Sequence, residues 1–366
     1  MKIKIERKSF VDALSVGCQM SGKARGLSIL ENIKLTIKSL TATISSYDSE
    51  VAITKRTSIL EQDEDFTLCV EPKVLLTMLR SIKDNEVELS FKRNKCEVIH
   101  SKGVLSLPYM DAEDFPTPIF DNEQSNFCVS SELLFNWLKE AKIFVSTNNL
   151  YPQMMGVYLY FFENEFGVAS TDMNVLYNNT IEYDYNDEKK DAIISTKAVD
   201  ALLPMINGSE KVTIMIGSRN VAFRIDDAML VATKTEKPFP NFKAIIPKEK
   251  EIEIEVSKDD FLESIKRAMI TANEKTCLLK LNIGGMSIKI NSEDVMNEKK
   301  SHEECFATCN GGELTLGVKG TYVIDMVSSI ESENIKILLK NERTPILWCD
   351  MLNNNKILLQ MPCVVE

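Results

Sequence analysis

A pattern of helices and strands recurs three times along this chain, at intervals of about 124 residues. One series of segments has a polar start and apolar spacing near 3.6, which predicts helices at 8–17, 131–141 and 258–269. A second helical series is predicted at 71–82, 195–206 and 318–330. Period-two alternation predicts a strand after each member of the second series, at 87–91, 212–216 and 335–339. Further strands are expected at 32–39, 156–163 and 280–290, and a proline-containing phrase closes each interval at Pro116, Pro240 and Pro362.

Several features recurring in register indicate an α+β chain of three tandem similar domains, each with two helices and antiparallel sheet. Polar linkers place the boundaries near 120 and 247, which gives domains 1–120, 121–247 and 248–366. Each domain is expected to be a doubled unit of strands plus one helix. Tandem repetition produces curvature, and the ends of one arc can meet those of a second copy. Twelve helices at about 10 Å each would line a ring whose hole, about 28 Å wide, admits a nucleic-acid duplex.

The charge of the chain gives one argument against a nucleic-acid partner and one argument for it. The net charge of −11 argues against a simple nucleic-acid binder, whose footprint is normally basic. The six helical segments nevertheless sum to +5, which leaves −16 on the rest of the chain. That segregation predicts a basic lining inside an acidic shell, able to hold phosphates loosely and without sequence choice. Any single lysine, taken alone, is better explained as a solvated surface residue.

Composition and motifs exclude several classes of protein. The 44% hydrophobic and 27% charged residues are typical of a globular protein. Without an apolar run of about 18 residues or a basic-apolar leader, we expect a cytoplasmic protein with no membrane partner. Nine cysteines without a CxxC pair indicate reduced thiols. A zinc site needs four ligands, whereas the one local cluster offers three, His302, Cys305 and Cys309, so no metal or cofactor is expected.

Catalysis is not expected either. The chain has two histidines and lacks the phosphate-loop, nucleophile-elbow, zincin and dinucleotide patterns. Its carboxylate pairs, Asp226-Asp227 and Asp259-Asp260, are better explained as a hairpin turn and the first turn of a helix. No catalytic residue is therefore assigned.

A set of phrases, in order along the chain, resembles the beta subunit of bacterial DNA polymerase III, the sliding-clamp family. These phrases are MKIKIERKSF, LSILENIKLTI, DAEDFP, STD at 170–172, FPNFKAIIP, NEK at 273–275, TYVIDMV and the terminal MP. The resemblance covers essentially the whole length. It implies a DNA-clamp fold and a head-to-tail homodimer that forms a six-domain ring around duplex DNA, as a processivity factor in DNA replication. The implied partners are the catalytic subunit of DNA polymerase III within its holoenzyme, the clamp loader complex and other proteins with a clamp-binding motif.

The resemblance also implies sites. Family members bind a short hydrophobic peptide in a groove between the second and third domains. Carried over by position, the groove residues here are Met154, Thr171, Asn174, Val175, Leu176, Pro240, Ile245, Tyr322, Met361 and Pro362. Apolar anchors such as Leu176, Ile245 and Met361 would accept a Leu or Phe side chain, and Thr171 and Tyr322 would offer hydrogen bonds. The alternative is that Leu176 and Met361 are ordinary core or strand residues.

The chain departs from the family pattern at the groove. Where the family commonly has Thr-Asp-Gly-His-Arg-Leu, residues 171–176 are Thr-Asp-Met-Asn-Val-Leu, and Ala244 stands where an arginine is usual. These changes make the groove less basic and leave its peptide preference open.

DNA contacts and a ring seam are implied at further positions. The DNA-binding candidates are Lys23, Arg25, Arg80, Asn148, Asn149 and Lys197. At the seam, Leu105 and Leu107 of a first-domain edge strand would meet Ile270 and Thr271, and the polar Thr271 suggests weaker closure. The competing hypothesis is a repeat scaffold that binds protein peptides without encircling DNA, which the acidic balance, Val175 and Ala244 favour.

Overall fold

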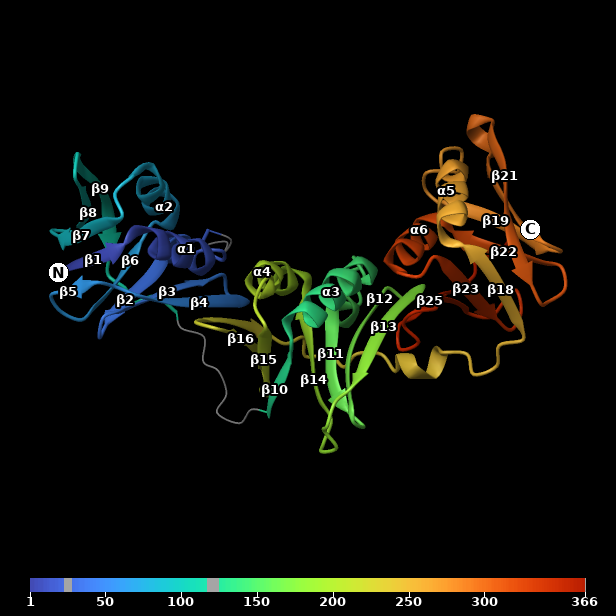
Figure 1. The fold of residues 1–366 in the computed structure, drawn as a ribbon, viewed down its shortest axis with the longest axis horizontal. Coiled ribbons are helices and arrows are strands. Elements are labelled where there is room, and N and C mark those ends of the chain that lie inside the picture. The colour runs from blue at the N-terminus through green and yellow to red at the C-terminus, as the bar shows by residue number, and fades with distance from the viewer. Residues whose placement is uncertain (23–27, 117–124, 366) are drawn as a thin grey trace. The chain divides into compact units, whose positions relative to one another are not determined.

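The computed structural model describes residues 1–22, 28–116 and 125–365, and Figure 1 shows its ribbon. The chain forms two compact units: unit 1 comprises Met1–Asn136 and Ile194–Glu236, and unit 2 comprises Trp137–Ile193 and Lys237–Glu366. Each unit contains one extended sheet, and every strand pairing whose register is resolved is antiparallel. The predicted α+β class is therefore confirmed.

The sheet of unit 1 has 13 strands among the described residues. Their order across the sheet is β10 (Ser125–Ser130), β15 (Lys211–Ile216), β16 (Asn220–Ile225), β17 (Ala228–Thr233), β4 (Val51–Ser58), β3 (Thr41–Tyr47), β2 (Ile33–Lys38), β6 (Phe66–Val70), β9 (Gly103–Met110), β8 (Lys95–His100), β7 (Glu86–Lys92), β1 (Lys2–Glu6) and β5 (Glu61–Gln62).

The sheet of unit 2 has 12 strands within the same described ranges. Their order is β14 (Lys190–Ser195), β11 (Gly156–Phe162), β12 (Glu165–Thr171), β13 (Val175–Glu182), β25 (Ile357–Gln360), β24 (Ile346–Asp350), β23 (Asn334–Leu339), β18 (Ile252–Ser257), β21 (Lys299–Cys309), β20 (Ser287–Asp294), β19 (Leu278–Gly284) and β22 (Leu314–Lys319).

The six predicted helices are confirmed to within two residues at each end. They are α1 (Arg7–Gly17), α2 (Pro72–Ser81), α3 (Ser131–Ala141), α4 (Thr196–Ile206), α5 (Lys258–Met269) and α6 (Gly320–Ser329). Five short 3₁₀ turns complete the described elements: η1 (Ser28–Glu31), η2 (Lys142–Phe144), η3 (Pro152–Met154), η4 (Phe242–Ile245) and η5 (Val295–Asn297).

Local chemistry explains where these helices begin. The Glu6 carboxylate accepts hydrogen bonds from the backbone N–H groups of Lys8 and Ser9 at the start of α1. The Ser195 hydroxyl accepts from the Ala198 N–H at the start of α4. Pro72 occupies the first turn of α2, where its missing N–H costs nothing. The starts of these three helices are therefore encoded locally by the sequence.

The prediction of one strand over 280–290 is wrong, because that segment forms the hairpin β19–β20. Gly284 pairs with Ser287, and Gly285 has a φ of +60° in the turn between them. A left-handed residue reverses the chain at little cost when it is glycine, which lacks a Cβ. The Gly-Gly pair therefore marks a turn.

Two strand pairings within the units join segments that are far apart in sequence. In unit 1, β17 pairs with β4 over five residues, from Ala228↔Lys55 to Ala232↔Val51. In unit 2, β13 pairs with β25 over four residues, from Val175↔Gln360 to Asn178↔Ile357. Each pairing joins strands of neighbouring predicted repeats, and the second carries the candidate site.

Candidate functional site

A tight turn at Asp172–Asn174 connects β12 to β13. The Asp172 Oδ1 atom accepts hydrogen bonds from the backbone N–H groups of Asn174 at 2.9 Å and Val175 at 3.0 Å. The Thr171 hydroxyl donates to the Val175 carbonyl at 2.6 Å. Met173 has a φ of 82°, a conformation that side chains other than glycine rarely adopt. The turn is therefore held by its own side chains.

Residues from the last part of the chain converge on this turn. The Tyr322 hydroxyl, on α6, donates to the Asp172 Oδ2 atom at 2.5 Å. The Met361 N–H donates to the Asn174 carbonyl at 2.7 Å. Burial, and then the Asp172 carboxylate, raise the pKa of Tyr322 above its usual value, so its hydroxyl stays protonated and remains a donor. The Lys319 Nζ atom lies 4.3 Å from the centroid of the Tyr322 ring.

An apolar cluster lies beside the turn. Leu176 is fully buried and belongs to one cluster with Leu359 of β25 and Phe242 of η4. Pro240 lines a cavity of about 340 Å³, next to Phe239, whose ring stacks on Tyr158 at a centroid distance of 4.4 Å. Aromatic packing therefore holds this segment against β11, and the apolar cluster joins Phe242 to the paired strands β13 and β25.

The structure brings most of the predicted groove residues together and leaves a few of them exposed. Thr171, Asn174, Val175, Leu176, Tyr322 and Met361 are linked by the hydrogen bonds and strand register described above, Ile245 ends η4, and Pro362 follows Met361. Ile245 is 44% exposed and Met361 is 37% exposed, whereas Met154 is buried. The hydroxyl hydrogens of Thr171 and Tyr322 are already donated inside the protein. A partner here would therefore meet mainly apolar side chains.

Two of the candidates for DNA contact, Lys23 and Arg25, lie outside the described residues. The described candidates differ in their environments. The Lys197 Nζ atom contacts the Glu50 Oε2 atom at 2.9 Å and the Asp48 Oδ2 atom at 3.1 Å, which neutralises its charge locally. The Arg80 Nη2 atom donates to the Ser15 hydroxyl at 3.0 Å, and its side chain is exposed.

The loop candidates are shaped by a turn. The Asn148 Oδ1 atom accepts from the Leu150 N–H at 3.0 Å, and Asn148, Asn149 and Leu150 are all exposed. The loop therefore presents two polar side chains and one large apolar side chain to solvent, so its chemistry does not single out a phosphate ligand.

The first seam candidates, Leu105 and Leu107, lie on a strand segment that, among the described residues, has a partner strand along one edge only. Within the described ranges, Gly103–Pro108 of β9 pair with β8 and with no strand on their other side. Leu107 is a core residue and Leu105 packs partly against that core, whereas Val104 is 58% exposed. Alternation along the strand explains this difference, because residues 105 and 107 face the core.

The second seam segment lies in unit 2. Lys299–Phe306 of β21 pair with β20, and within the described part of the chain no strand pairs with their other edge. Ile270 is 75% exposed at the end of α5. The Thr271 hydroxyl is within hydrogen-bonding distance of the Ala268 carbonyl, at 3.2 Å, and of the Ser292 hydroxyl, at 2.7 Å. Thr271 therefore needs no polar partner across a seam.

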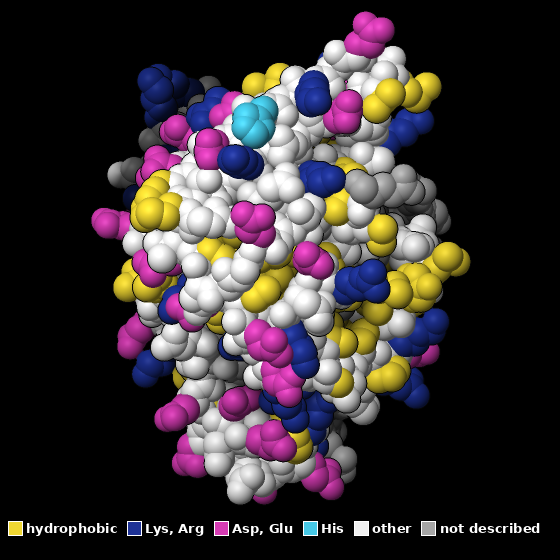
Figure 2. Space-filling view, turned by 90° about the vertical axis from the view of Figure 1, so that its right-hand side faces the viewer, with side chains coloured by type: hydrophobic (Ala, Val, Ile, Leu, Met, Phe, Trp, Pro, Cys, Tyr) yellow, Lys and Arg dark blue, Asp and Glu magenta, His cyan; other side chains and the backbone are white. Residues whose placement is uncertain are grey.

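Sequence reasoning missed the apolar residues near this segment. Val295 and Met296, in η5 at the tip of the β20–β21 hairpin, are 77% and 91% exposed. Figure 2 shows exposed apolar side chains lying between acidic and basic ones on the face that it presents. The sequence did contain a signal for this exposed apolar surface: Val295 and Met296 follow an alternating strand at a position where a turn normally has polar residues.

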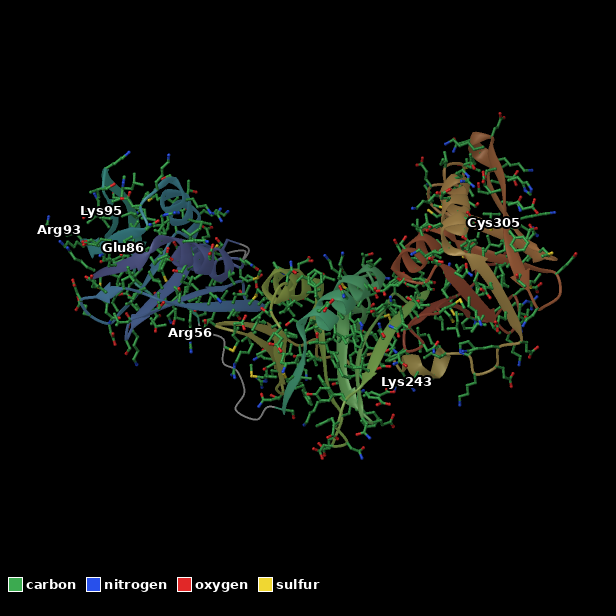
Figure 3. All side chains as sticks on the ribbon, in the orientation of Figure 1. Arg56, Glu86, Arg93, Lys95, Lys243 and Cys305 are labelled. Atoms are coloured by element: carbon green, nitrogen blue, oxygen red, sulfur yellow. The ribbon has the colours of Figure 1, made fainter. Side chains whose placement is uncertain are left out.

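Neither a metal centre nor a membrane span emerges from the described residues. His302, Cys305 and Cys309 all lie on β21, where side chains three residues apart point to opposite faces, and Cys305, labelled in Figure 3, is buried. Residues 1–22, 28–116 and 125–365 contain no group of three or more potential metal ligands. No helix in those ranges is long and apolar enough to cross a bilayer.

Comparisons with known proteins agree along the whole chain. The N-terminal, central and C-terminal domains of the DNA polymerase III beta subunit match residues 1–119, 128–241 and 243–364. The beta sliding clamp of Rickettsia bellii is 22% identical over 361 residues and that of Escherichia coli K12 is 21% identical over 369 residues, covering 95% and 99% of both chains.

Solved structures show the same fold. The DNA polymerase III beta subunit of Pseudomonas aeruginosa superposes with a TM-score of 0.95 at 18% identity, and the DNA polymerase sliding clamp of Bacillus subtilis with 0.91 at 20% identity; both alignments cover 100% of each chain. These matches make the clamp fold of the chain plain, and with the three domain matches they show that it belongs to the DNA polymerase III beta subunit family, the bacterial beta sliding clamps of DNA replication.

Proposed function

We propose that this protein is a processivity factor that encircles duplex DNA as a head-to-tail homodimer and tethers a DNA polymerase through the groove beside β13 and β25. Its work is binding and it catalyses no reaction. We propose that it acts in the cytoplasm, with three domains divided near residues 120 and 247, and that its partners are the catalytic subunit of DNA polymerase III, the clamp loader and other proteins that present a short hydrophobic peptide.

One observation, the way in which neighbouring repeats are joined, supports the proposed ring. Inside the units, neighbouring repeats are joined by continuing a sheet from one to the next, at β17–β4 and at β13–β25. Among the described residues, Gly103–Pro108 of the first predicted repeat and Lys299–Phe306 of the third each pair with a strand on one side only. An unpaired edge is a ready template for another strand. Because the two edges differ, copies would associate head to tail, and two copies would close with two identical seams.

Charge supports the same pairing. Residues 92–108 carry a net charge of +3, and residues 293–306 carry −3. Figure 3 labels Arg93 and Lys95, which belong to the β7–β8 hairpin next to β9. Opposite charges across an interface favour the correct partner and oppose the pairing of like edges. Head-to-tail association is therefore favoured over head-to-head.

The groove supports tethering by apolar contact. Ile245, at the end of η4, and Met361, which binds the Asn174 carbonyl, present exposed apolar surface, and the turn at Asp172 is fixed by Tyr322. Neither Asn174 nor Val175 is charged, so a partner peptide would be recognised by its apolar side chains and backbone.

The decisive experiment compares circular and linear DNA. After loading onto nicked circular duplex, the protein should remain bound through gel filtration at a salt concentration that strips phosphate contacts, and it should be lost once the circle is cut. Equal retention before and after cutting would contradict encirclement. Failure to stay on either form, with peptide binding intact, would favour the non-encircling scaffold. The local pairing of Lys197 with Asp48 and Glu50 also favours that alternative, because it occupies a lysine that was expected to contact DNA.

A further inference from the structure

A buried lysine sits where β25 begins. Lys356 is 6% exposed and directly precedes Ile357, the first residue of β25. Its Nζ atom donates to the Glu140 Oε1 atom at 2.9 Å and to the Ser329 carbonyl at 2.7 Å. Burying an ammonium group is costly unless partners compensate it, so these two contacts hold the lysine in one place.

The same lysine ties α6 to the groove. Ser329 is the last residue of α6, and a cation that binds a terminal carbonyl is favoured by the helix dipole. Near the other end of α6, Tyr322 binds Asp172 in the turn before β13, and the Gln360 Nε2 atom donates to the Lys319 carbonyl at 3.4 Å. The helix is therefore attached at both ends to the paired strands that carry the candidate groove.

We propose that Lys356 is a positioning residue of the peptide groove: by binding Glu140 and the Ser329 carbonyl it fixes the start of β25, and thereby the placement of Met361 against the turn at Asp172. The four-residue pairing of β25 with β13 is short, so an anchor at its start controls how well Met361 is held at its end. Because Lys356 is buried, it acts through β25 and α6. This inference rests on the proposed function of the groove.

The test uses the full-length chain and two readouts. Binding of a fluorescein-labelled hexapeptide ending in Leu-Phe is measured by fluorescence anisotropy, and hydrogen exchange of the Leu358–Met361 amides is measured without peptide. The variants are Lys356→Met and Lys356→Arg. A matched control is Lys336→Met, which breaks a pair with Glu253 (Nζ to Oε1, 2.6 Å) between β23 and β18 of the same unit.

The double variant Lys356→Met with Glu140→Leu separates positioning from charge compensation. Removing both partners leaves no buried charge, so it should restore thermal stability lost in Lys356→Met. Peptide affinity should stay reduced, because the contact with the Ser329 carbonyl is still missing.

We expect Lys356→Met to weaken peptide binding at least tenfold and to speed hydrogen exchange at Leu358–Met361. Lys356→Arg should recover most of the affinity. The control Lys336→Met should bind the peptide like the parent. Affinity within twofold of the parent in Lys356→Met, or full recovery in the double variant, would overturn the role of Lys356. A parent chain that does not bind the peptide would instead refute the groove itself.

Discussion

The proposed seam makes a quantitative prediction at Ile270. This side chain is 75% exposed, so about three quarters of the roughly 1.5–3 kcal/mol available from burying an isoleucine remains to be gained on association. Replacing Ile270 by Asp forfeits about 1–2 kcal/mol per seam, and burial of an unpaired carboxylate adds to the loss. The proposed ring has two seams, so its dimer should lose about 2–4 kcal/mol, which is a roughly 30- to 1,000-fold rise in dissociation constant.

Sedimentation velocity from nanomolar to micromolar concentration measures that constant directly. Leu352→Asp provides a matched control, because Leu352 is also 75% exposed in unit 2 but lies in the turn between β24 and β25. The control should sediment like the parent. The reasoning would be refuted by an Ile270→Asp dimer as tight as the parent dimer, or by equal weakening in the control.

Three predictions concern stability. In Gly167→Ala the new Cβ would clash with the Tyr160 ring, so the midpoint of thermal unfolding should fall by the equivalent of about 1–3 kcal/mol; an unchanged midpoint would show that the ring moves freely. Arg93 and Asn94 form a two-residue hairpin turn with φ of 50° and 62°, so Arg93→Asn with Asn94→Gly should stabilise the protein by about 0.5–1 kcal/mol in urea, and a loss would contradict that turn geometry. Burial raises the pKa of Asp325, so its carboxylate lowers the stability of the folded state at neutral pH. Asp325→Asn should therefore raise the midpoint of thermal unfolding at pH 7, and this gain should shrink as the pH falls through the pKa of the folded state. A gain that grows toward low pH would refute the expected direction of the effect.

Much of the architecture could be predicted because its signals are local. A helix needs apolar residues at 3.6 spacing and a cap, and both lie within about a dozen residues, as at 258–269, where Ser257 caps α5. The failure at 280–290 was also local: the alternation continues through the Gly-Gly pair, and only the left-handed Gly285 shows that the chain reverses there. The groove positions came from the family resemblance, since Leu176 and Met361 by themselves look like ordinary strand residues.

The sequence by itself determined the six helices, the alternating strands and the threefold repeat, because each depends on neighbours a few residues away. For the residues that the structure describes, the tertiary fold decided which strands pair, which edges remain without a partner strand and which charges are compensated. Tyr322 meets Asp172 across 150 residues, and Lys356 meets Glu140 across 216. No local pattern encodes such contacts, because burial and pairing depend on how distant segments pack together.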